Sequence, residues 1–445
     1  MKSRFRYILS FALGVFTVLP ASAQQPRLLS LQDCLQEGLK NNYALQITRN
    51  KEEIAHNNAT LANAGALPSV DASASVRPNL TNLDRTVSRV TGDATRNTNY
   101  LDNTVDVGVS LSWTIFDGFK IQTNYQQLKT LEQQGETSTR MAVEDLIADI
   151  SSEYYTLIQQ NIRREHYQYA MQLSRERLRI AQVNYETGRF SGLDFHQAEV
   201  DYHSDSTALV RQEEAVQNAV IRLNKLMGNA DVSRAIQVPE KAIAVQNRFN
   251  VDDLWQQTLA TNTSLLYASQ NQTLAEQDLR KVLSRNYPYV RLNAQYGYTH
   301  TNYDISATRV RDNLGLSGGL TVGYNIFDGN KRRERRNAEI NIRNQQLQRE
   351  QLELELRASL MSFWQSYTNA LSLLELQRKN VDIARTNLDI ATDRYKLGNL
   401  SGFDMRQVEK NLLDAEERQL QLEYDAKLCE ISLLLISGGV SAYLE

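Results

Sequence analysis

Two stretches of this sequence occur twice. Thr114-Ile115-Phe116-Asp117-Gly118 returns 211 residues later as Asn325-Ile326-Phe327-Asp328-Gly329. The stretch YETGRFSGLD, from Tyr185 to Asp194, returns 210 residues later as YKLGNLSGFD, from Tyr395 to Asp404. Because several dissimilar residue types recur in the same order, the sequence predicts an internal tandem duplication. We place the first repeat at residues 24–240 and the second at residues 241–445.

Each repeat has the same order of predicted elements: a helix, two strands, a long helix and a return helix. In the first repeat we expect a helix at 30–66, strands at 69–77 and 104–116, a long helix at 118–187 and a return helix at 192–228. In the second repeat we expect a helix at 251–286, strands at 288–299 and 313–327, a long helix at 329–397 and a return helix at 402–437. The predicted fold class is therefore mainly α with a small β part.

The strand predictions rest on strict alternation of apolar and polar residues. From Val105 to Ile115 every second residue is apolar, and Asp106 and Thr114 are among the residues between them. The second repeat alternates in a similar way over residues 314–326. A period of two over ten or more residues predicts a strand with one apolar and one polar face.

The scarcity of proline permits unusually long helices. Pro68 and Pro288 precede the first strand of each repeat, and residues 79–238 and 289–445 contain no proline. Proline is the main breaker of helices, so these spans allow helices of roughly 70 residues, about 105 Å long at 1.5 Å per residue. In both return helices, small and apolar residues follow steps of four and three, which predicts coiled-coil packing.

Local signals mark both ends of the long helices. Asp117 and Asp328 stand before them, where a carboxylate can accept hydrogen bonds from free backbone N–H groups. Gly188 and Gly398 stand after them, and we expect each glycine to end its helix in the left-handed conformation. The repeats therefore agree in their capping residues as well as in their hydrophobic patterns.

Composition excludes several classes of protein. Two cysteines in 445 residues exclude a disulfide scaffold. No run of about 18 apolar residues after residue 20 indicates a transmembrane helix. A net charge of −3 with mixed signs does not indicate nucleic-acid binding. We find no catalytic or cofactor motif, and His196 and His203 have no cysteine beside them that would complete a zinc site.

The N-terminus predicts export from the cytoplasm. Residues 1–23 combine a basic start, an apolar stretch and the small-residue motif Ala21-Ser22-Ala23. These features are typical of a secretory signal peptide.

Four amphipathic strands in an exported protein need a partner for their apolar faces. A small soluble sheet packed on helices is one possibility. Membrane insertion is favoured because the strands approach the 9–11 residues that cross a bilayer and because aromatic residues gather at their ends. The predicted interface aromatics are Trp113, Phe116, Tyr324 and Phe327. Four strands cannot close a barrel, so insertion would require an oligomer; a dimer would give about eight strands and a trimer about twelve.

The chain resembles the TolC-type outer membrane efflux proteins. Besides the duplicated turns, the resemblance rests on LQDCLQEG at residues 31–38, on Asn41-Asn42 after it, and on Leu67-Pro68. It covers essentially the whole mature chain. The chain departs from the family pattern at Tyr43, where many relatives have proline, and in its longer first outer loop.

The resemblance implies a homotrimer in the outer membrane of a Gram-negative bacterium. Four transmembrane strands per chain would close a twelve-stranded β-barrel in outer membrane lipid, and the coiled-coil helices would form a periplasmic α-barrel. The protein would be the passive exit duct of a tripartite efflux or type I secretion system, driven by an inner-membrane transporter through a periplasmic adaptor. The alternative is a periplasmic coiled-coil adaptor or a structural protein of the envelope. The residues do not indicate the cargo.

The resemblance also points to two candidate sites. The adaptor-docking tip would consist of Gly188, Arg189, Phe190, Ser191, Gly398, Asn399, Leu400 and Ser401. Turn chemistry alone also explains most of these residue types, since the serines can cap the following helices. Asp389 and Asp393, one helical turn apart, are the candidate periplasmic gate, where a three-fold ring of carboxylates would favour cations. A solvated helix face is the alternative for these two aspartates.

Overall fold

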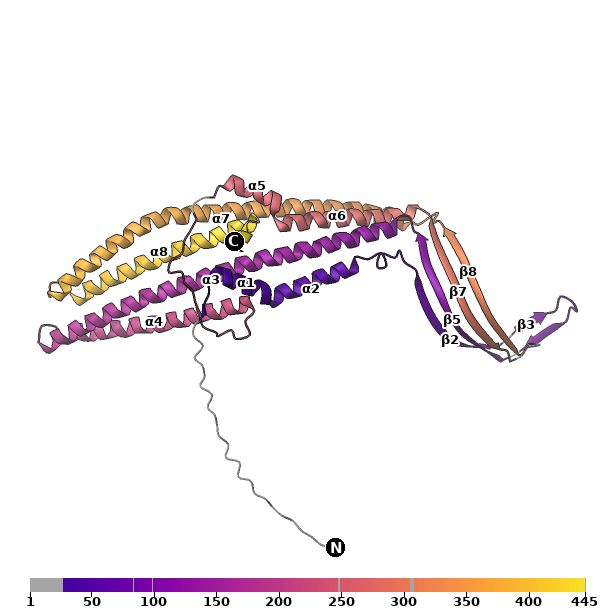
Figure 1. Cartoon of the computed structure of the whole chain (residues 1–445), viewed down its shortest axis with the longest axis horizontal. Helices are drawn as coiled ribbons and strands as arrows, with labels where there is room; N and C mark the ends of the chain where they lie inside the picture. Colours follow the sequence, from indigo (N-terminus) through magenta and orange to yellow (C-terminus); the bar gives the residue numbers. More distant parts are fainter. Residues whose placement is uncertain (1–26, 83, 98, 247–248, 305–307, 445) are drawn as a thin grey trace, which may run out of the picture.

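The computed structural model describes residues 27–82, 84–97, 99–246, 249–304 and 308–444. The predicted signal peptide, residues 1–23, lies outside the described residues. The chain is elongated, with helices over most of its length and a sheet of long strands at one end (Figure 1). The two halves of the sequence run side by side along the whole molecule, as the duplication predicts.

The sheet contains four long antiparallel strands in the order β2-β5-β7-β8. These strands are β2 (Ser69–Thr81), β5 (Tyr100–Phe116), β7 (Tyr289–Asn302) and β8 (Val310–Gly323). Each repeat supplies one hairpin, and pairing of β5 with β7 joins the two repeats. The predicted strand at 313–327 is wrong at its C-terminal end: β8 ends at Gly323, and residues 324–327 belong to no strand. β2, in contrast, is longer than the predicted strand at 69–77, because it continues to Thr81.

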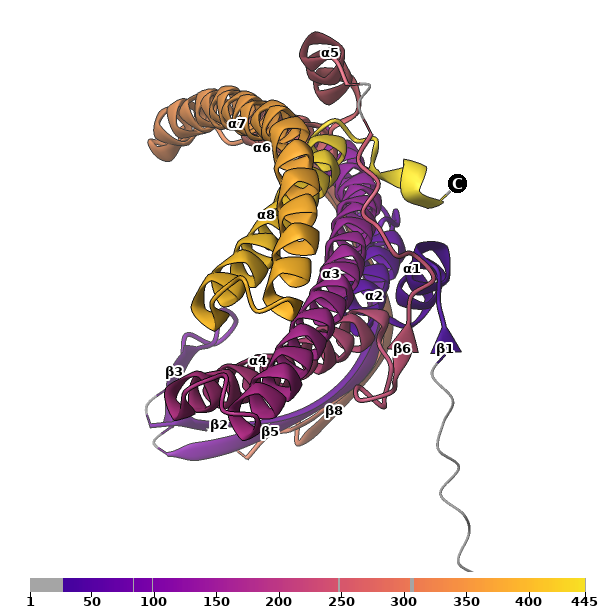
Figure 2. The ribbon, with the colours of Figure 1, turned by 90° about the vertical axis from the view of Figure 1, so that its left-hand side faces the viewer.

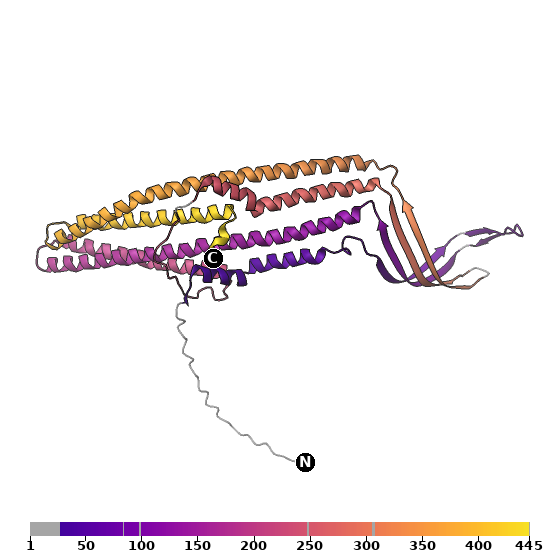
Figure 3. The same ribbon diagram turned by 45° about the horizontal axis from the view of Figure 1, so that its top comes forward.

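The first outer loop contains a hairpin that the sequence did not indicate. β3 (Asp84–Val87) pairs antiparallel with β4 (Ala94–Asn97). This hairpin projects beyond the ends of the long strands, at the end of the sheet far from the helices (Figures 1 and 3). The described residues of the corresponding loop in the second repeat contain no such hairpin.

The first helix of each repeat is broken by an asparagine, which corrects the predicted helices at 30–66 and 251–286. The observed helices are α1 (Leu31–Asn41) and α2 (Tyr43–Asn58), then α5 (Val251–Thr261), α6 (Thr263–Leu283) and the short 3-10 helix η1 (Ser284–Asn286). Asn42 has extended backbone angles, φ −61° and ψ 122°, and Asn262 has nearly the same values. Each asparagine caps the following helix, and each amide donates to a carbonyl at the end of a return helix, Leu226 or Ile436.

The four long helices agree closely with the predicted ranges. They are α3 (Lys120–Glu186), α4 (Gly192–Met227), α7 (Asn330–Lys396) and α8 (Gly402–Ile436). α3 and α7 each have 67 residues, which corresponds to about 100 Å. Seen from the end that carries the helical turns, the pairs α3–α4 and α7–α8 lie next to each other, and α3 contacts α8 (Figure 2). Among the described residues, we find no helix with the length and apolarity needed to cross a membrane.

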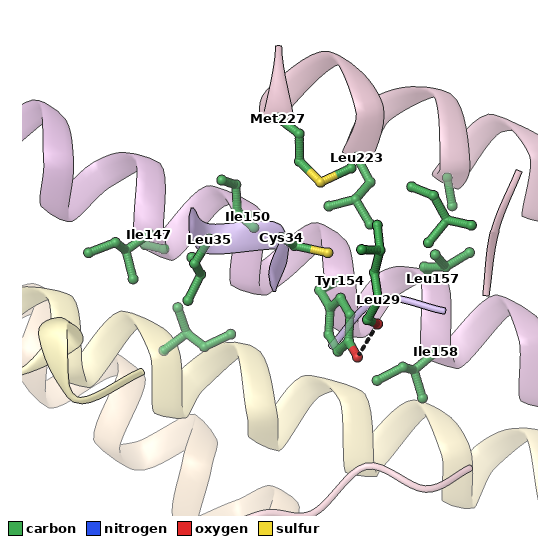
Figure 4. Packing of buried hydrophobic residues seen from close by; sticks show 14 of the residues in the cluster. Leu29, Cys34, Leu35, Ile147, Ile150, Tyr154, Leu157, Ile158, Leu223 and Met227 are labelled. Carbon is green, nitrogen blue, oxygen red and sulfur yellow. Dashed lines mark hydrogen bonds between the residues drawn. The ribbon is translucent and has the colours of Figure 1, made fainter. Parts of the chain in front are cut away.

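The main hydrophobic core lies where α1, α3, α4 and α8 meet. Cys34, Leu35, Ile150, Leu157 and Leu223 are all fully buried there (Figure 4). Burying a leucine or isoleucine contributes about 1.5–3 kcal/mol, so this cluster stabilises the middle of the helical body. A short parallel pair, β1 (Arg27–Leu28) with β6 (Ile236–Gln237), ties the N-terminal segment to the linker between the repeats. The chain ends in the 3-10 helix η2 (Val440–Leu444), which packs against the same core.

The seam between the repeats is polar nearer the sheet. Along α3 and α6, the side chain of Gln134 donates to Asn271 at 2.7 Å, and that of Gln277 donates to Thr130 at 2.9 Å. These side-chain hydrogen bonds fix the register of α3 against α6 at positions where apolar side chains would permit sliding.

Candidate functional site: the sheet faces, the helical turns and the coiled-coil flanks

The long strands form one continuous apolar face. The register aligns Ala72, Val109, Tyr296 and Leu316 in one row across all four strands. Neighbouring rows on this face are also apolar, and many of their large side chains are exposed in the single chain. A continuous exposed apolar face of this extent indicates contact with lipid or with another protein surface.

The opposite face of the sheet is polar. Asp106 pairs with Arg77 and accepts a hydrogen bond from Thr299 at 2.8 Å. The next row contains only small residues, with Gly108 opposite Gly297. A Cβ atom at Gly108 would lie 2.9 Å from the carbonyl oxygen of Tyr296, so the neighbouring backbone leaves no room for a side chain there. Polar and small side chains on this face leave room for water.

Aromatic residues gather at the end of the sheet nearer the helices. The Trp113 ring nitrogen donates to the carbonyl of Ala66 at 2.9 Å. Phe116 packs edge-on against Phe119, with ring centroids 5.2 Å apart, and Phe119 packs in the same way against Tyr287. These rings join the strands to the starts of the helices.

Tyr324 and Phe327 lie outside the strands, contrary to the predicted strand at 313–327. Both follow the end of β8, and the Phe327 residue is 87% exposed. The Nζ atom of Lys331 lies 5.9 Å from the centroid of the Tyr324 ring. They remain near the same end of the sheet as Trp113, but in the connection from β8 to α7.

The Phe-Asp-Gly motifs connect the sheet to the long helices. Asp117 accepts a hydrogen bond from the backbone N–H of Ile121, and Asp328 accepts one from Asn330, as the capping prediction requires. Gly118 has φ +72°, and a Cβ atom there would overlap the carbonyl oxygen of Ser284. Glycine is therefore required at this crossing, where the first repeat meets the second.

The two glycine turns lie together at the end of the molecule farthest from the sheet (Figures 1 and 3). Gly188 and Gly398 have φ values of +75° and +76°, which confirms the predicted left-handed conformation. Ser191 and Ser401 cap the next helices, since each accepts a hydrogen bond from the backbone N–H three residues later.

The side chains of the turns divide into two groups. Phe190 and Leu400 pack against a core that contains Tyr395, and the Phe190 and Tyr395 rings lie 6.3 Å apart between centroids. Arg189 and Asn399 are exposed. The structure thus brings the two halves of the predicted tip together and leaves polar side chains on its surface. Asp389 and Asp393 are exposed on α7 just before this end.

A buried ionic cluster near the turns was not predicted. Arg177 of α3 lies between two carboxylates, 3.0 Å from Asp201 and 3.1 Å from Glu409. Burial raises the pKa of Glu409 above its ordinary value, although the positive charges of Arg177 and Arg406 oppose this shift. Arg406 of α8 also binds Asp205 through both terminal nitrogens. The sequence held one signal, since Asp205 occupies a core position of the α4 heptad.

α4 and α7 each carry a second heptad outside the buried cores, and the α7 set borders a groove shared with Val408 and Asn411 of α8. Both sets are exposed and follow steps of three and four, which is the spacing of a coiled-coil seam. On α4 the set is Leu193, His196, Val200, His203, Thr207 and Val210. On α7 it is Leu376, Asn380, Ile383, Asn387, Ile390 and Arg394. Sequence patterning revealed only the inward-facing heptads of the two return helices, because those heptads have the more regular apolar and small residues.

The described side chains form extended apolar, polar and ionic surfaces. Within the described part of the chain, no group of three or more His, Cys, Asp and Glu side chains is placed to hold a metal ion. Polar groups instead line one face of the sheet, while ionic and aromatic contacts hold the helical turns.

Comparison with known proteins agrees with this geometry. The family model described as outer membrane efflux protein matches residues 34–229 and 254–439, one match in each repeat. The chain is 22% identical over 429 residues to outer membrane efflux protein BepC of Brucella suis biovar 1, covering 93% of this chain and 86% of that protein. It is 24% identical over 288 residues to outer membrane protein TolC of Escherichia coli, covering 58% of this chain and 55% of that protein.

Solved structures share the fold at low sequence identity. The outer-membrane channel OprN gives a TM-score of 0.72 at 18% identity, over 92% of this chain and 90% of that chain. The outer membrane protein VceC of Vibrio cholerae gives 0.72 at 18% identity, over 92% and 96%. CusC gives 0.72 at 14% identity, over 95% and 96%. Because the family match spans both repeats, the chain belongs to the outer membrane efflux protein family and is an outer membrane efflux channel of the TolC type.

Proposed function

We propose that three copies of this chain close into one duct that carries efflux substrates across the outer membrane. The observation that carries the proposal is the sheet, which has an apolar face over most of its length and two free edges. Among the described residues, β2 pairs only with β5 and β8 pairs only with β7. In a bilayer these edges must find partners, and β2 of one copy can pair with β8 of the next until a barrel of about twelve strands is complete.

The flanks of the helical body support the same cyclic arrangement. Nearer the sheet, α2 exposes Ile47 and Ile54, and α7 exposes Ile340, Leu347 and Leu354 at seven-residue spacing. Nearer the turns, the second heptads of α4 and α7 are exposed on opposite flanks of the chain. Because the two flanks of one chain differ, the α4 flank of one copy contacts the α7 flank of the next. Repeating this contact closes a ring.

In this ring α4 of one copy lies antiparallel to α7 of the next. Counting from the turns, Val200 reaches the height of Ile390, and His196 that of Arg394. In the part of the seam nearest the turns, apolar then meets apolar and polar meets polar, as His203 with Asn387 also shows. A double variant, Val200→Cys with Ile390→Cys, tests the contact, since oxidation should join copies into covalent trimers. Each single variant is the control, because it lacks the partner thiol and should stay monomeric in a denaturing gel.

The polar face of the sheet would line the membrane part of the duct, and the helices would continue it through the periplasm. A duct of this kind conducts passively, and the driving force would come from an inner-membrane transporter. A periplasmic adaptor would link the two. We assign its docking surface to the turns, where Arg189 and Asn399 are exposed beside the packed Phe190 and Leu400.

We assign the periplasmic gate to Asp389 and Asp393. Both carboxylates are exposed, one turn apart on α7 and close to the turns. Three copies would place six carboxylates around the entrance, where they would attract cations and repel anions.

A further inference from the structure

The β3–β4 hairpin has no counterpart among the described residues of the second repeat, and the duct does not require it. We define the hairpin as residues 84–97. Its register places Arg85 directly opposite Arg96 and Val87 opposite Ala94. Directly opposed residues share a face of a hairpin, and so do residues two apart on one strand. Arg85, Val87, Ala94 and Arg96 therefore form one face, which is basic at its base and apolar toward its turn.

The turn adds a third arginine and an exposed valine. Ser88 fixes the turn, because its hydroxyl accepts from the backbone N–H groups of Val90 and Thr91. Gly92 adopts φ +73°. Val90 at the tip is 94% exposed, and Arg89 beside it is exposed as well. The hairpin thus presents its apolar and basic side chains from a defined backbone.

The opposed arginines need a source of negative charge. Like charges directly opposite each other are destabilising, and a two-stranded hairpin has little stability to spare. Among the described side chains, Arg85, Arg89 and Arg96 form no ion pair. A basic face with apolar side chains beside it is typical of segments that lie on an anionic lipid surface.

We propose that this hairpin binds the phosphate groups of the glycolipid in the outer leaflet of the outer membrane. The inference rests on the proposed function, because the barrel orientation turns the far end of the sheet toward the cell exterior. The guanidinium groups of Arg85 and Arg96 together donate hydrogen bonds to phosphate oxygens, and Arg89 makes a further contact. The hairpin lies along the headgroup layer, with Val87 and Val90 turned toward the apolar boundary. The trimer then carries three such anchors around its outer rim.

Binding of fluorescent lipopolysaccharide to the purified trimer in detergent tests the proposal. The double variant Arg85→Gln with Arg96→Gln should weaken binding at least tenfold, and higher salt should weaken the wild-type binding as well. The matched control is Arg343→Gln with Arg349→Gln, which removes two exposed arginines from α7 and should leave binding unchanged. Dephosphorylated lipopolysaccharide should bind no better to the wild type than to the double variant.

A charge-swapped variant separates loss of phosphate binding from loss of the hairpin. Arg96→Glu places a glutamate opposite Arg85, which keeps the hairpin by a favourable cross-strand pair. It should nevertheless lose the lipopolysaccharide affinity. Equal binding by the wild type and both hairpin variants would overturn the proposal, and so would equal binding of dephosphorylated glycolipid or preferential binding of phosphatidylglycerol vesicles. The trimer and its conductance should persist in every variant; loss of these in the wild type would count against the proposed function instead.

Discussion

Arg177 of α3 and Glu409 of α8 form an ion pair between the two repeats, with 3.1 Å between Nη1 and Oε2. Their side chains are only 2% and 4% exposed. The pair lies near the helical turns, where the two coiled pairs meet. It therefore joins segments that are far apart in the sequence at the end of the molecule assigned to adaptor contact.

Removing one member of this pair should destabilise the helical body. Arg177→Met leaves both Asp201 and Glu409 without their cation in a buried site, at a cost of about 3–5 kcal/mol. The double variant Arg177→Met with Glu409→Met should recover part of that loss. Thermal unfolding followed by circular dichroism measures both. Lys379→Met is the control, since its exposed pair with Glu375 is worth at most about 1 kcal/mol. An Arg177→Met variant as stable as this control would contradict the account.

The two Phe-Asp-Gly motifs should differ in their tolerance of alanine. Gly118→Ala forces a side chain into the carbonyl oxygen of Ser284 and keeps it at a positive φ, so the melting temperature should fall by several degrees. Gly329→Ala is the matched control, because Gly329 has φ −61° and only the end of the Phe327 ring near its would-be Cβ. Equal melting temperatures for the two variants would show that the crossing tolerates a side chain.

The sequence predicted the repeated architecture because duplication, alternation and heptads are local patterns. Strands, long helices and glycine turns all follow from residues close together in the chain. The breaks at Asn42 and Asn262 did not, because asparagine fits within a helical pattern and only its hydrogen bond to the return helix fixes the break. The β3–β4 hairpin lacks apolar alternation. The Arg177 cluster joins α3, α4 and α8, and no spacing in the sequence reveals that contact.

Charged substitutions at the turns should separate assembly from adaptor binding. Arg189 and Asn399 are exposed, so Arg189→Glu with Asn399→Glu should leave the melting temperature and the trimer unchanged. The same variant should lose co-purification of the periplasmic adaptor. Arg343→Glu, an exposed change far from the turns, should retain the adaptor. Adaptor recovery equal to that of the wild type would reject the docking assignment.

Neutralising the candidate gate should change ion selectivity. Asp389→Asn with Asp393→Asn removes six carboxylates from a trimer, so the reversal potential in a potassium chloride gradient should shift toward anion permeation. Glu350→Gln changes an exposed acid of α7 that lies farther from the turns, and this variant should leave the reversal potential unchanged. An unchanged reversal potential in the double variant would show that Asp389 and Asp393 lie on an ordinary solvated helix face.

The most direct test of the channel is single-channel recording of the purified trimer in a planar lipid bilayer. We expect discrete conductance steps for the wild type. Leu316→Arg places a charge in the middle of the apolar face, at a cost of roughly 2–4 kcal/mol per copy, and should abolish insertion. Ser317→Arg places the same charge on the opposite, polar face and should still conduct. Absence of conductance from the wild-type trimer, or equal behaviour of the two arginine variants, would show that the sheet does not form a membrane channel.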